Sequence, residues 1–315
     1  MYFFDAAEIE TRLDFQTLVP ALFEAHKGTM PSASHLVEDE PGGNGENKFI
    51  ALLAWAAREL IVTKLVGVFP GNTKLVPAQP SIQGLVAAFD ATTGAARFVA
   101  DGAALTYRKT AADSGLGASL LARPDAEILL VVGAGGLAPH MIEAHCSVRP
   151  SIRKVLVWNR TIARAVSLVA RLEMPNVEVV AVSDLDQAVG VADIISCVTM
   201  SDRPLIKGEL LRPGSHIDLV GAYRPDMREA DDTTMTRGTI FVDTRSGMTG
   251  AGDLVQPIHL KLLSWADVKA DLFELCGDRT LGRQDAEEIT IFKNVGGAHL
   301  DLFTAVQLNR LISAS

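Results

Sequence analysis

Small residues follow a run of apolar residues near the middle of the chain, in the segment ILLVVGAGGLA. Gly133 permits a tight turn, Gly135 lets the backbone approach a ligand closely, and Ala138 is small enough for a helix to pack on a strand. Backbone N–H groups around Gly136 and Leu137, at the start of the expected helix, can bind a phosphate. These residues therefore predict a site for the pyrophosphate of a dinucleotide.

Apolar runs flank this turn on both sides, at residues 128–132 and 155–158. The order of strand, glycine turn, helix and strand is the context that a dinucleotide-binding turn requires. The alternative is a structural turn in an α/β protein that binds no nucleotide. We favour the nucleotide site because both strands are present and the second ends in polar residues.

The polar residues that end the second strand are Asn159, Arg160 and Thr161. In NAD-binding domains an Asp or Glu usually occupies this point and accepts hydrogen bonds from the ribose. A carboxylate repels a 2′-phosphate, whereas a guanidinium beside a hydroxyl binds one. The sequence therefore predicts a preference for NADP(H) over NAD(H). The alternative is that Arg160 is a solvated surface charge and that the site accepts both cofactors.

The composition is typical of a globular protein large enough for two domains. Of the 315 residues, 48% are hydrophobic and 21% are charged. A net charge of −9 disfavours nucleic acid and anionic membranes as main partners. Three scattered cysteines predict neither a disulfide framework nor a metal site. We expect a cytoplasmic protein, because no signal-peptide pattern or membrane-spanning apolar segment is present.

Two domains are expected. Residues 124–294 are expected to form an NAD(P)-binding domain. From Pro124 to about Met248 they show alternating strand and helix patterns, which predict an α/β fold with a doubly wound parallel Rossmann sheet. Residues 1–123, joined by a C-terminal helix at about 295–315, predict an α+β domain with a helix after Asp101. The segment from DAEEITIFKNV onward is expected to be a turn followed by that helix. The expected strands of the first domain are 49–55, 60–69 and a hairpin of 83–90 and 95–101, and the later Rossmann strands are 177–182, 194–198, 217–220 and 240–242.

Cationic residues stand out on apolar elements of the first domain. Lys64 lies inside ELIVTKLVGVF, where a buried lysine is costly unless it is paired or functional. The alternative is a solvent-facing lysine, and periodicity alone does not decide between the two. Arg108 and Lys109 point about 100° apart on a helix, so at most one of them faces a site. On position alone, both are expected on a solvated helix face.

Seven segments together resemble the ornithine cyclodeaminase/mu-crystallin family, over about Pro31 to Leu302. In chain order they are TKLVGVFPGNT, SIQGLVAAFDATTG, LTYRKTAADS, VVGAGGLA, WNRT, GAYRPDMREADD and EEITIFKNVGGAHLDL. The GAYRPDMREADD segment resembles the mu-crystallin branch, whose members act as ketimine reductases. The resemblance implies a nicotinamide cofactor, an amino-acid or cyclic-imine substrate, and a homodimer whose interface is formed by strands of the substrate-binding domain, residues 1–123.

The resemblance also implies roles for individual residues. Lys64 matches the lysine that contacts the substrate near the nicotinamide. Lys109 occupies the place of an arginine that binds the substrate carboxylate, and Thr110 follows it as in the family's Arg-Thr pair. Thr199 matches a residue on the nicotinamide side, and Val220, at the end of a Rossmann strand, is expected at the cofactor. Lys64 and Lys109 are therefore the expected catalytic residues.

Departures from the family pattern lie on the substrate side. The family's early Pro-x-Arg reads Pro-Ser-Ala here, so Ala33 replaces a carboxylate-binding arginine. At the position where this chain has Gly-Ala-Tyr, ending at Tyr223, the resemblance leads us to expect the Gly-Ala-Asp of ornithine cyclodeaminases. A phenol with a pKa of about 10 is a poor substitute for a carboxylate base. Tyr223 is instead expected to shape the substrate pocket.

Three functional hypotheses remain. The first is an NAD(P)(H)-dependent imine reductase or amino-acid dehydrogenase, in which Lys64 exchanges a proton and Lys109 binds a carboxylate. The second is ornithine cyclodeaminase itself, an ammonia-releasing lyase that forms proline. Arg160 and Tyr223 argue against this second hypothesis. The third is an NADPH-binding protein without catalysis, and the replacement of family arginines by Ala33 and Lys109 favours this hypothesis.

Overall fold

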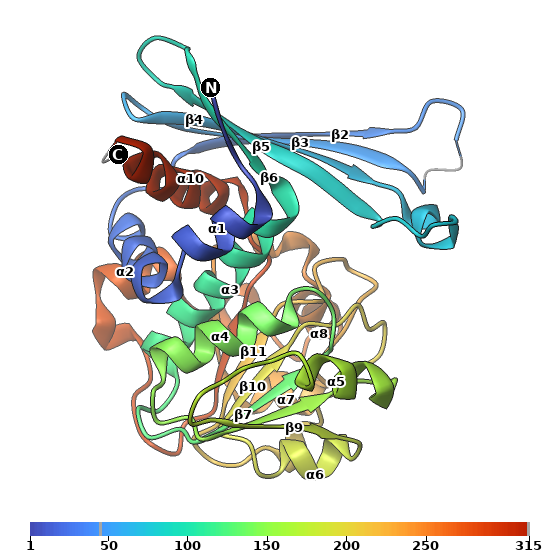
Figure 1. Cartoon of the computed structure of the whole chain (residues 1–315). Helices are drawn as coiled ribbons and strands as arrows, with labels where there is room; N and C mark the ends of the chain where they lie inside the picture. Colours follow the sequence, from blue (N-terminus) through green and yellow to red (C-terminus); the bar gives the residue numbers. More distant parts are fainter. Residues whose placement is uncertain (44–45, 314–315) are drawn as a thin grey trace. The chain divides into compact units, whose positions relative to one another are not determined.

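A computed structural model describes residues 1–43 and 46–313, which form two compact units (Figure 1). Of the described residues, the first unit contains 1–25, 29–43, 46–110 and 297–313, and the second contains 26–28 and 111–296. Residues 44–45, and residues 314–315 of the expected C-terminal segment, lie outside the described residues.

The first unit is built on a six-stranded sheet with the strand order β1-β6-β5-β4-β3-β2. The four pairs from β2–β3 to β5–β6 are antiparallel, whereas β1 pairs with β6 in parallel. The four strands expected from apolar runs are confirmed, whereas β1 and β2 were not expected. The strands are β1 (Tyr2–Phe4), β2 (Ser32–Asp39), β3 (Lys48–Ala56), β4 (Leu60–Val68), β5 (Ile82–Asp90) and β6 (Ala96–Asp101).

Helices accompany this sheet on one face. They are α1 (Ala6–Arg12), α2 (Phe15–His26), α3 (Gly102–Leu121) and α10 (Ala298–Ser313). The expected start of α3 is confirmed, because Asp101 Oδ1 accepts a 2.8 Å hydrogen bond from the N–H of Ala104. The chain passes from the first unit to the second inside α3, between residues 110 and 111.

The two faces of the sheet differ in burial. Alternate residues of β4 are buried and intervening ones half-buried, as expected for a strand with one covered face. Helix α10 contacts β3 and β4 and lies along the sheet in Figure 1. The other face of β3 carries Phe49, Leu53 and Trp55, all of which are exposed. Lys64 lies on the covered face.

The second unit is built on an eight-stranded sheet with the order β13-β12-β14-β11-β10-β7-β8-β9. Its strands are β7 (Ile128–Val132), β8 (Lys154–Trp158), β9 (Glu178–Val182), β10 (Ile194–Cys197), β11 (His216–Leu219), β12 (Thr239–Val242), β13 (Val268–Asp271) and β14 (Thr290–Lys293). Its further helices are α4 (Ala138–Val148), α5 (Ile162–Val169), α6 (Leu185–Val189), α7 (Asp232–Arg237), α8 (Gly252–His259) and α9 (Leu272–Gly277).

All neighbouring strands of this sheet are parallel. Strands β8 and β9 follow β7 on one side of that strand. The chain then reverses direction across the sheet and places β10 and β11 on the other side of β7. In open α/β sheets, ligands bind beside such a reversal, at the carboxyl ends of the strands. The prediction of a Rossmann sheet is confirmed.

One prediction for this unit was wrong. The segment Thr290–Lys293, expected in a turn before the last helix, is the buried strand β14 between β11 and β12. Lys293 ends it and pairs inside the protein with Asp253 at 3.2 Å. A strand of four residues that includes a lysine lacks the continuous apolar run by which buried strands are recognised.

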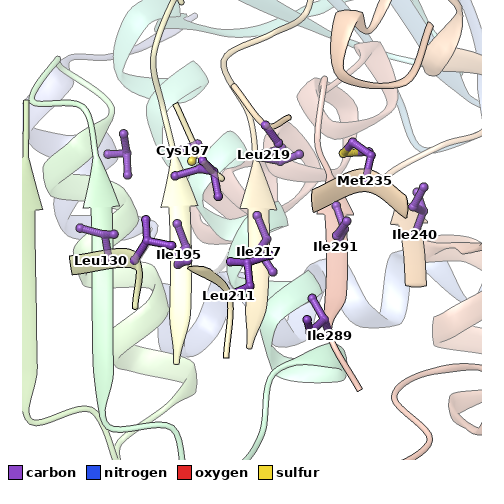
Figure 2. Close-up of a cluster of buried hydrophobic side chains, with 14 of the residues drawn as sticks. Leu130, Ile195, Cys197, Leu211, Ile217, Leu219, Met235, Ile240, Ile289 and Ile291 are labelled. Atoms are coloured by element: carbon purple, nitrogen blue, oxygen red, sulfur yellow. The ribbon is translucent and has the colours of Figure 1, made fainter. Parts of the chain in front are cut away.

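The core of the second unit holds these strands in register. Leu130, Ile195, Ile217 and Ile291 form one row across β7, β10, β11 and β14, and all four are fully buried (Figure 2). Each such side chain contributes roughly 1.5–3 kcal/mol through burial. Their packing fixes the carboxyl ends of the strands, which carry the predicted cofactor residues.

Candidate active site

The turn after β7 needs a glycine at its first position. Gly133 has a φ of 122°, and its N–H donates a 2.8 Å hydrogen bond to the carbonyl of Trp158. A Cβ at Gly133 would lie 2.8 Å from the carbonyl oxygen of Val198. Both the backbone conformation and the closeness of the next strand therefore exclude a larger residue.

Gly135 differs from Gly133 because its surroundings are open. A Cβ built there would meet no atom of the described protein within 4 Å, so the space above this backbone is open. The first residue of α4 is Ala138, and the residue before it, Leu137, has no side-chain acceptor that could cap the helix. The N–H of Ala138 donates a 3.1 Å hydrogen bond to the carbonyl of Gly135, and Pro139 has no N–H. The amides that can bind an anion are therefore those of the turn just before the helix, at Gly136 and Leu137. The turn fits the pyrophosphate of a dinucleotide.

The residues that end β8 lie at the same edge of the sheet. The side-chain amide of Asn159 donates a 2.9 Å hydrogen bond to the carbonyl of Thr161, which holds the short connection to α5. Arg160 is exposed. Its guanidinium is therefore accessible to a phosphate in solution.

The ends of β10 and β11 are joined by a buried carboxylate. Glu229 accepts hydrogen bonds from the N–H and hydroxyl of Thr199, at 2.6 and 2.8 Å, and from the N–H of Gly221 at 2.7 Å. Burial raises the pKa of Glu229 to about 8. Val220, next to Gly221, bonds through its N–H to the carbonyl of Cys197. Glu229 thus fixes the positions of two expected cofactor residues, Thr199 and Val220.

Tyr223 lies in the turn after β11, and 47% of its surface is exposed. Its backbone N–H bonds to the carbonyl of Gly221 at 3.0 Å. The next residue, Arg224, pairs with Asp226 on the surface at 2.7 Å. The phenol therefore remains accessible at the carboxyl edge of the sheet.

In the first unit, Lys64 lies in the middle of β4 and is 8% exposed. Its Nζ donates a 2.6 Å hydrogen bond to the hydroxyl of Thr106 on α3. That hydroxyl in turn donates to the carbonyl of Gly102 at 2.6 Å. Of the two readings that periodicity left open, the structure supports the buried and paired lysine.

Lys109 lies one turn after Thr106 on the same face of α3. Its Nζ lies 2.5 Å from Asp301 Oδ1 and donates a 3.2 Å hydrogen bond to the carbonyl of Gly297. The same oxygen of Asp301 lies 3.9 Å from Lys64 Nζ. The structure therefore brings the two predicted catalytic lysines together around one carboxylate from α10.

This arrangement changes the pKa of Lys64. Burial lowers its pKa, the like charge of Lys109 lowers it further, and the carboxylate of Asp301 opposes both, for a value of about 8. An ammonium with this pKa exchanges protons near neutral pH, unlike an ordinary lysine with a pKa of about 10.4.

The expectation that Arg108 and Lys109 lie on a solvated helix face was wrong. Both are buried, at 1% and 4% exposure. The guanidinium of Arg108 stacks over Phe15 at 3.7 Å and donates hydrogen bonds to the carbonyl of Leu13. Buried cations persist when partners compensate for lost water, and here those partners come from distant segments. Of the pair, only Lys109 joins the lysine cluster.

The remaining predicted substrate-side positions are Thr110 and Ala33. Thr110 is half-buried on α3. Ala33 is exposed on β2 and pairs with Ala54, which pairs with Val62 on β4. Since Val62 and Lys64 share a face, the position of the absent arginine lies on the same face as Lys64.

Three residues of this arrangement were not predicted: Thr106, Glu229 and Asp301. Asp301 had a signal in the sequence, because it is a lone carboxylate in the apolar segment AHLDLFTAVQL. The criterion that singled out Lys64 applies equally to it. Thr106 is a single hydroxyl that a helix commonly carries, and Glu229 lies in the polar segment RPDMREADD, so neither gives a comparable signal.

Comparison with known proteins agrees with this geometry. Residues 16–313 match the model of the ornithine cyclodeaminase/mu-crystallin family. The chain belongs to that family. Within it, the chain is 41% identical over 303 residues to a Δ1-pyrroline-2-carboxylate reductase of Paracoccus denitrificans, covering 96% of this chain and 94% of the relative. It is 36% identical over 253 residues to the ketimine reductase mu-crystallin of Mus musculus, covering 79% and 75%.

A solved structure of another family member resembles the whole chain. Thermococcus litoralis Δ1-pyrroline-2-carboxylate reductase, in complex with NADH and L-proline, superposes with a TM-score of 0.90. It is 26% identical, and the match covers 100% of this chain and 98% of that chain. No helix in residues 1–43 and 46–313 is both long and apolar enough to cross a membrane.

Proposed function

We propose that this protein is an NAD(P)H-dependent reductase of small cyclic ketimines that carry a carboxylate, such as Δ1-pyrroline-2-carboxylate. The observation that carries the proposal is the buried cluster of Lys64, Lys109 and Asp301, which has one net positive charge when both lysines are protonated. One net positive charge suits one substrate carboxylate, and an ammonium with a lowered pKa suits proton transfer to an imine nitrogen. The relatives named above support the substrate class.

The cofactor is assigned to the carboxyl edge of the Rossmann sheet. The amides of Gly135, Gly136 and Leu137 would hold the pyrophosphate, with Gly133 and Ala138 shaping the turn around it, and Thr199 and Val220 would lie beside the nicotinamide. When bound, the nicotinamide supplies or accepts the hydride. Arg160 supports a preference for NADP(H), because its exposed guanidinium follows directly after Asn159, where NAD-specific domains carry a carboxylate.

The substrate is assigned to the first unit's lysines. Lys109 binds the carboxylate, and Ala33 contributes no second cation. Lys64 donates a proton to the imine nitrogen, which becomes the amine of the product as hydride reaches the α-carbon. Lys64 then recovers a proton from water. Thr110 and Tyr223 are assigned to the pocket wall. This division makes residues 1–123 with the last helix the substrate-binding domain.

A homodimer is the proposed assembly. On the face of the six-stranded sheet opposite Lys64, Leu36, Leu53, Trp55 and Leu85 are exposed, and Phe49 lies near the end of β3. A contiguous patch of exposed apolar side chains usually marks a site where a partner binds. A second copy of the same sheet is the partner that the family resemblance implies.

Ornithine cyclodeamination is the less favoured activity. It needs a base that removes protons while an amine becomes an imine and ammonia leaves. The loop after β11 has Tyr223 at the position where the family's cyclodeaminases have an aspartate. A phenol has a pKa of about 10 and is therefore a weak replacement for that carboxylate base. Reduction of an existing imine does not need that base.

The experiment is a comparison of three reactions with the purified protein. Rapid oxidation of NADPH by Δ1-pyrroline-2-carboxylate, with formation of proline, supports the proposal. Release of ammonia from ornithine without net cofactor turnover would establish the cyclodeaminase instead. Tight NADPH binding with neither reaction would identify a binding protein that lacks catalysis.

A further inference from the structure

One carboxylate oxygen serves two lysines in the first unit. Asp301 Oδ1 lies 2.5 Å from Lys109 Nζ and 3.9 Å from Lys64 Nζ. Asp301 is 1% exposed, and both lysines are also buried. Because water is largely excluded, the charges act on one another more strongly than they would at the surface.

The two lysines have unequal partners. Lys109 has the closer ion pair with Asp301 and a hydrogen bond to the carbonyl of Gly297. Lys64 is hydrogen-bonded to a neutral group, the hydroxyl of Thr106. The charge of Lys109 is therefore compensated directly, whereas that of Lys64 depends on a more distant carboxylate and is opposed by Lys109.

The elements around Lys64 supply few other charges. In register with it are Leu52 on β3 and Val86 on β5, both apolar. Helix α3 supplies Lys109, and α10 supplies Asp301. Within the described residues, these two are the charged groups that shift the pKa of Lys64, in opposite directions.

We propose that Asp301 is a positioning residue that gives the two lysines different roles. It holds the Lys109 side chain in place for the substrate carboxylate through a direct ion pair, and it keeps Lys64 protonated at neutral pH for transfer to the imine nitrogen. The roles of the lysines rest on the proposed function. The effect of Asp301 on the charge of Lys64 is independent of that function, and it is measurable without substrate.

The test is an NMR titration of the full-length protein carrying ¹³C at the lysine ε-carbons, with the Lys64 signal assigned through Lys64→Arg. Asp301→Asn removes the anion that opposes the loss of the Lys64 proton and lowers the Lys64 midpoint by about one pH unit or more. Lys109→Gln removes the like charge, leaves Asp301 in place, and raises that midpoint. Asp39→Asn removes an exposed Asp–Lys pair with Lys48 and leaves the midpoint unchanged.

Opposite shifts in the two variants support the inference. Midpoints that stay fixed, or that move in the same direction, overturn it. If Asp301→Asn does not fold, Lys109→Gln decides alone, since an unchanged or lowered midpoint contradicts the proposal. If the wild-type protein reduces no ketimine, the proposed function fails while the titration still tests Asp301.

A kinetic measurement connects this charge to turnover. In Asp301→Asn, the pH above which kcat for reduction declines moves down together with the Lys64 midpoint. Asp301→Glu, which retains the charge, restores that decline toward the wild-type pH. A purely structural role would lower the amount of folded protein and leave the pH of the decline unchanged.

Discussion

Lys64 Nζ donates a 2.6 Å hydrogen bond to the hydroxyl of Thr106, which is itself committed as a donor to the carbonyl of Gly102. Because the threonine proton is engaged, its oxygen can only accept from the lysine. The bond fixes the direction of the ammonium within the buried face of β4. The remaining protons of Lys64 are left for other acceptors, including an imine nitrogen.

Replacement of Lys64 by methionine should separate catalysis from cofactor binding. Methionine fills similar volume without a proton to donate, so kcat for ketimine reduction falls by about 10²–10⁴. The Kd for NADPH, measured by fluorescence titration, stays within about twofold because Lys64 is not among the residues assigned to the nucleotide. Lys48→Met, at an exposed lysine, is the matched control. Retained turnover in Lys64→Met would show that another group supplies the proton.

The pH dependence of the two reaction directions should be opposite. The pKa of Lys64 is lowered to about 8, so its ammonium is the main form below that pH and its amine the main form above. Reduction uses the ammonium, and its kcat therefore declines about tenfold per pH unit once the pH exceeds about 8. Oxidation of the amine product uses the neutral lysine, so its kcat rises about tenfold per pH unit up to about pH 8 and levels off above it. Steady-state kinetics in both directions check this, and parallel profiles would contradict it.

The two glycines of the nucleotide turn should respond differently to alanine. At Gly133 the φ of 122° and the carbonyl of Val198, 2.8 Å from the new Cβ, make Gly133→Ala strained, so the melting temperature falls. At Gly135 the Cβ meets no described protein atom within 4 Å, so Gly135→Ala folds normally. It weakens NADPH binding because the methyl group occupies space assigned to the cofactor. Calorimetry and ligand titration distinguish the two, and unchanged binding in Gly135→Ala would place the pyrophosphate elsewhere.

Arg160 is expected to determine cofactor selectivity. Loss of a charge-assisted contact to the 2′-phosphate in Arg160→Ala raises the Kd for NADPH by about tenfold or more. The Kd for NADH changes little, since NADH has no 2′-phosphate. Arg164→Ala, at an exposed arginine later in α5, is the control. Equal weakening of both cofactors in Arg160→Ala would leave the preference for NADP(H) without support.

The exposed face of the six-stranded sheet should determine the oligomeric state. Leu53→Asp places a charge among Leu36, Trp55 and Leu85, and burying it in an interface is unfavourable. Light scattering coupled to size-exclusion chromatography should show a dimer for the wild type and a monomer for this variant. Val191→Asp, at an exposed residue of the second unit, should remain dimeric. A wild-type monomer would contradict the proposed assembly.

The Rossmann elements were predictable because their signals are local. The turn from Gly133 to Ala138, its flanking strands and the end of β8 follow one another within about one supersecondary unit. Strand β14 was missed because it is short and carries Lys293, whose cost is offset by Asp253, a residue from another element. Periodicity describes one segment at a time and gives no information on such a partner.

The lysine cluster was only partly predictable for the same reason. Lys64 was recognised as unusual in an apolar strand, but its burial depends on Asp301, which lies at the other end of the chain. Arg108 was assigned to solvent because neither Phe15 nor the carbonyl of Leu13 could be placed near it from sequence. Family resemblance indicated which cations matter, and the structure showed what compensates their charge.

The central claim is that hydride moves from the nicotinamide to the α-carbon of a cyclic ketimine. It is tested most directly with NADPH deuterated at C4, prepared separately as each of its two stereoisomers, and Δ1-pyrroline-2-carboxylate. Mass spectrometry and NMR of the product should find one deuterium at the α-carbon of proline from one stereoisomer of the cofactor. Proline without deuterium from either stereoisomer, or no proline at all, would contradict the account.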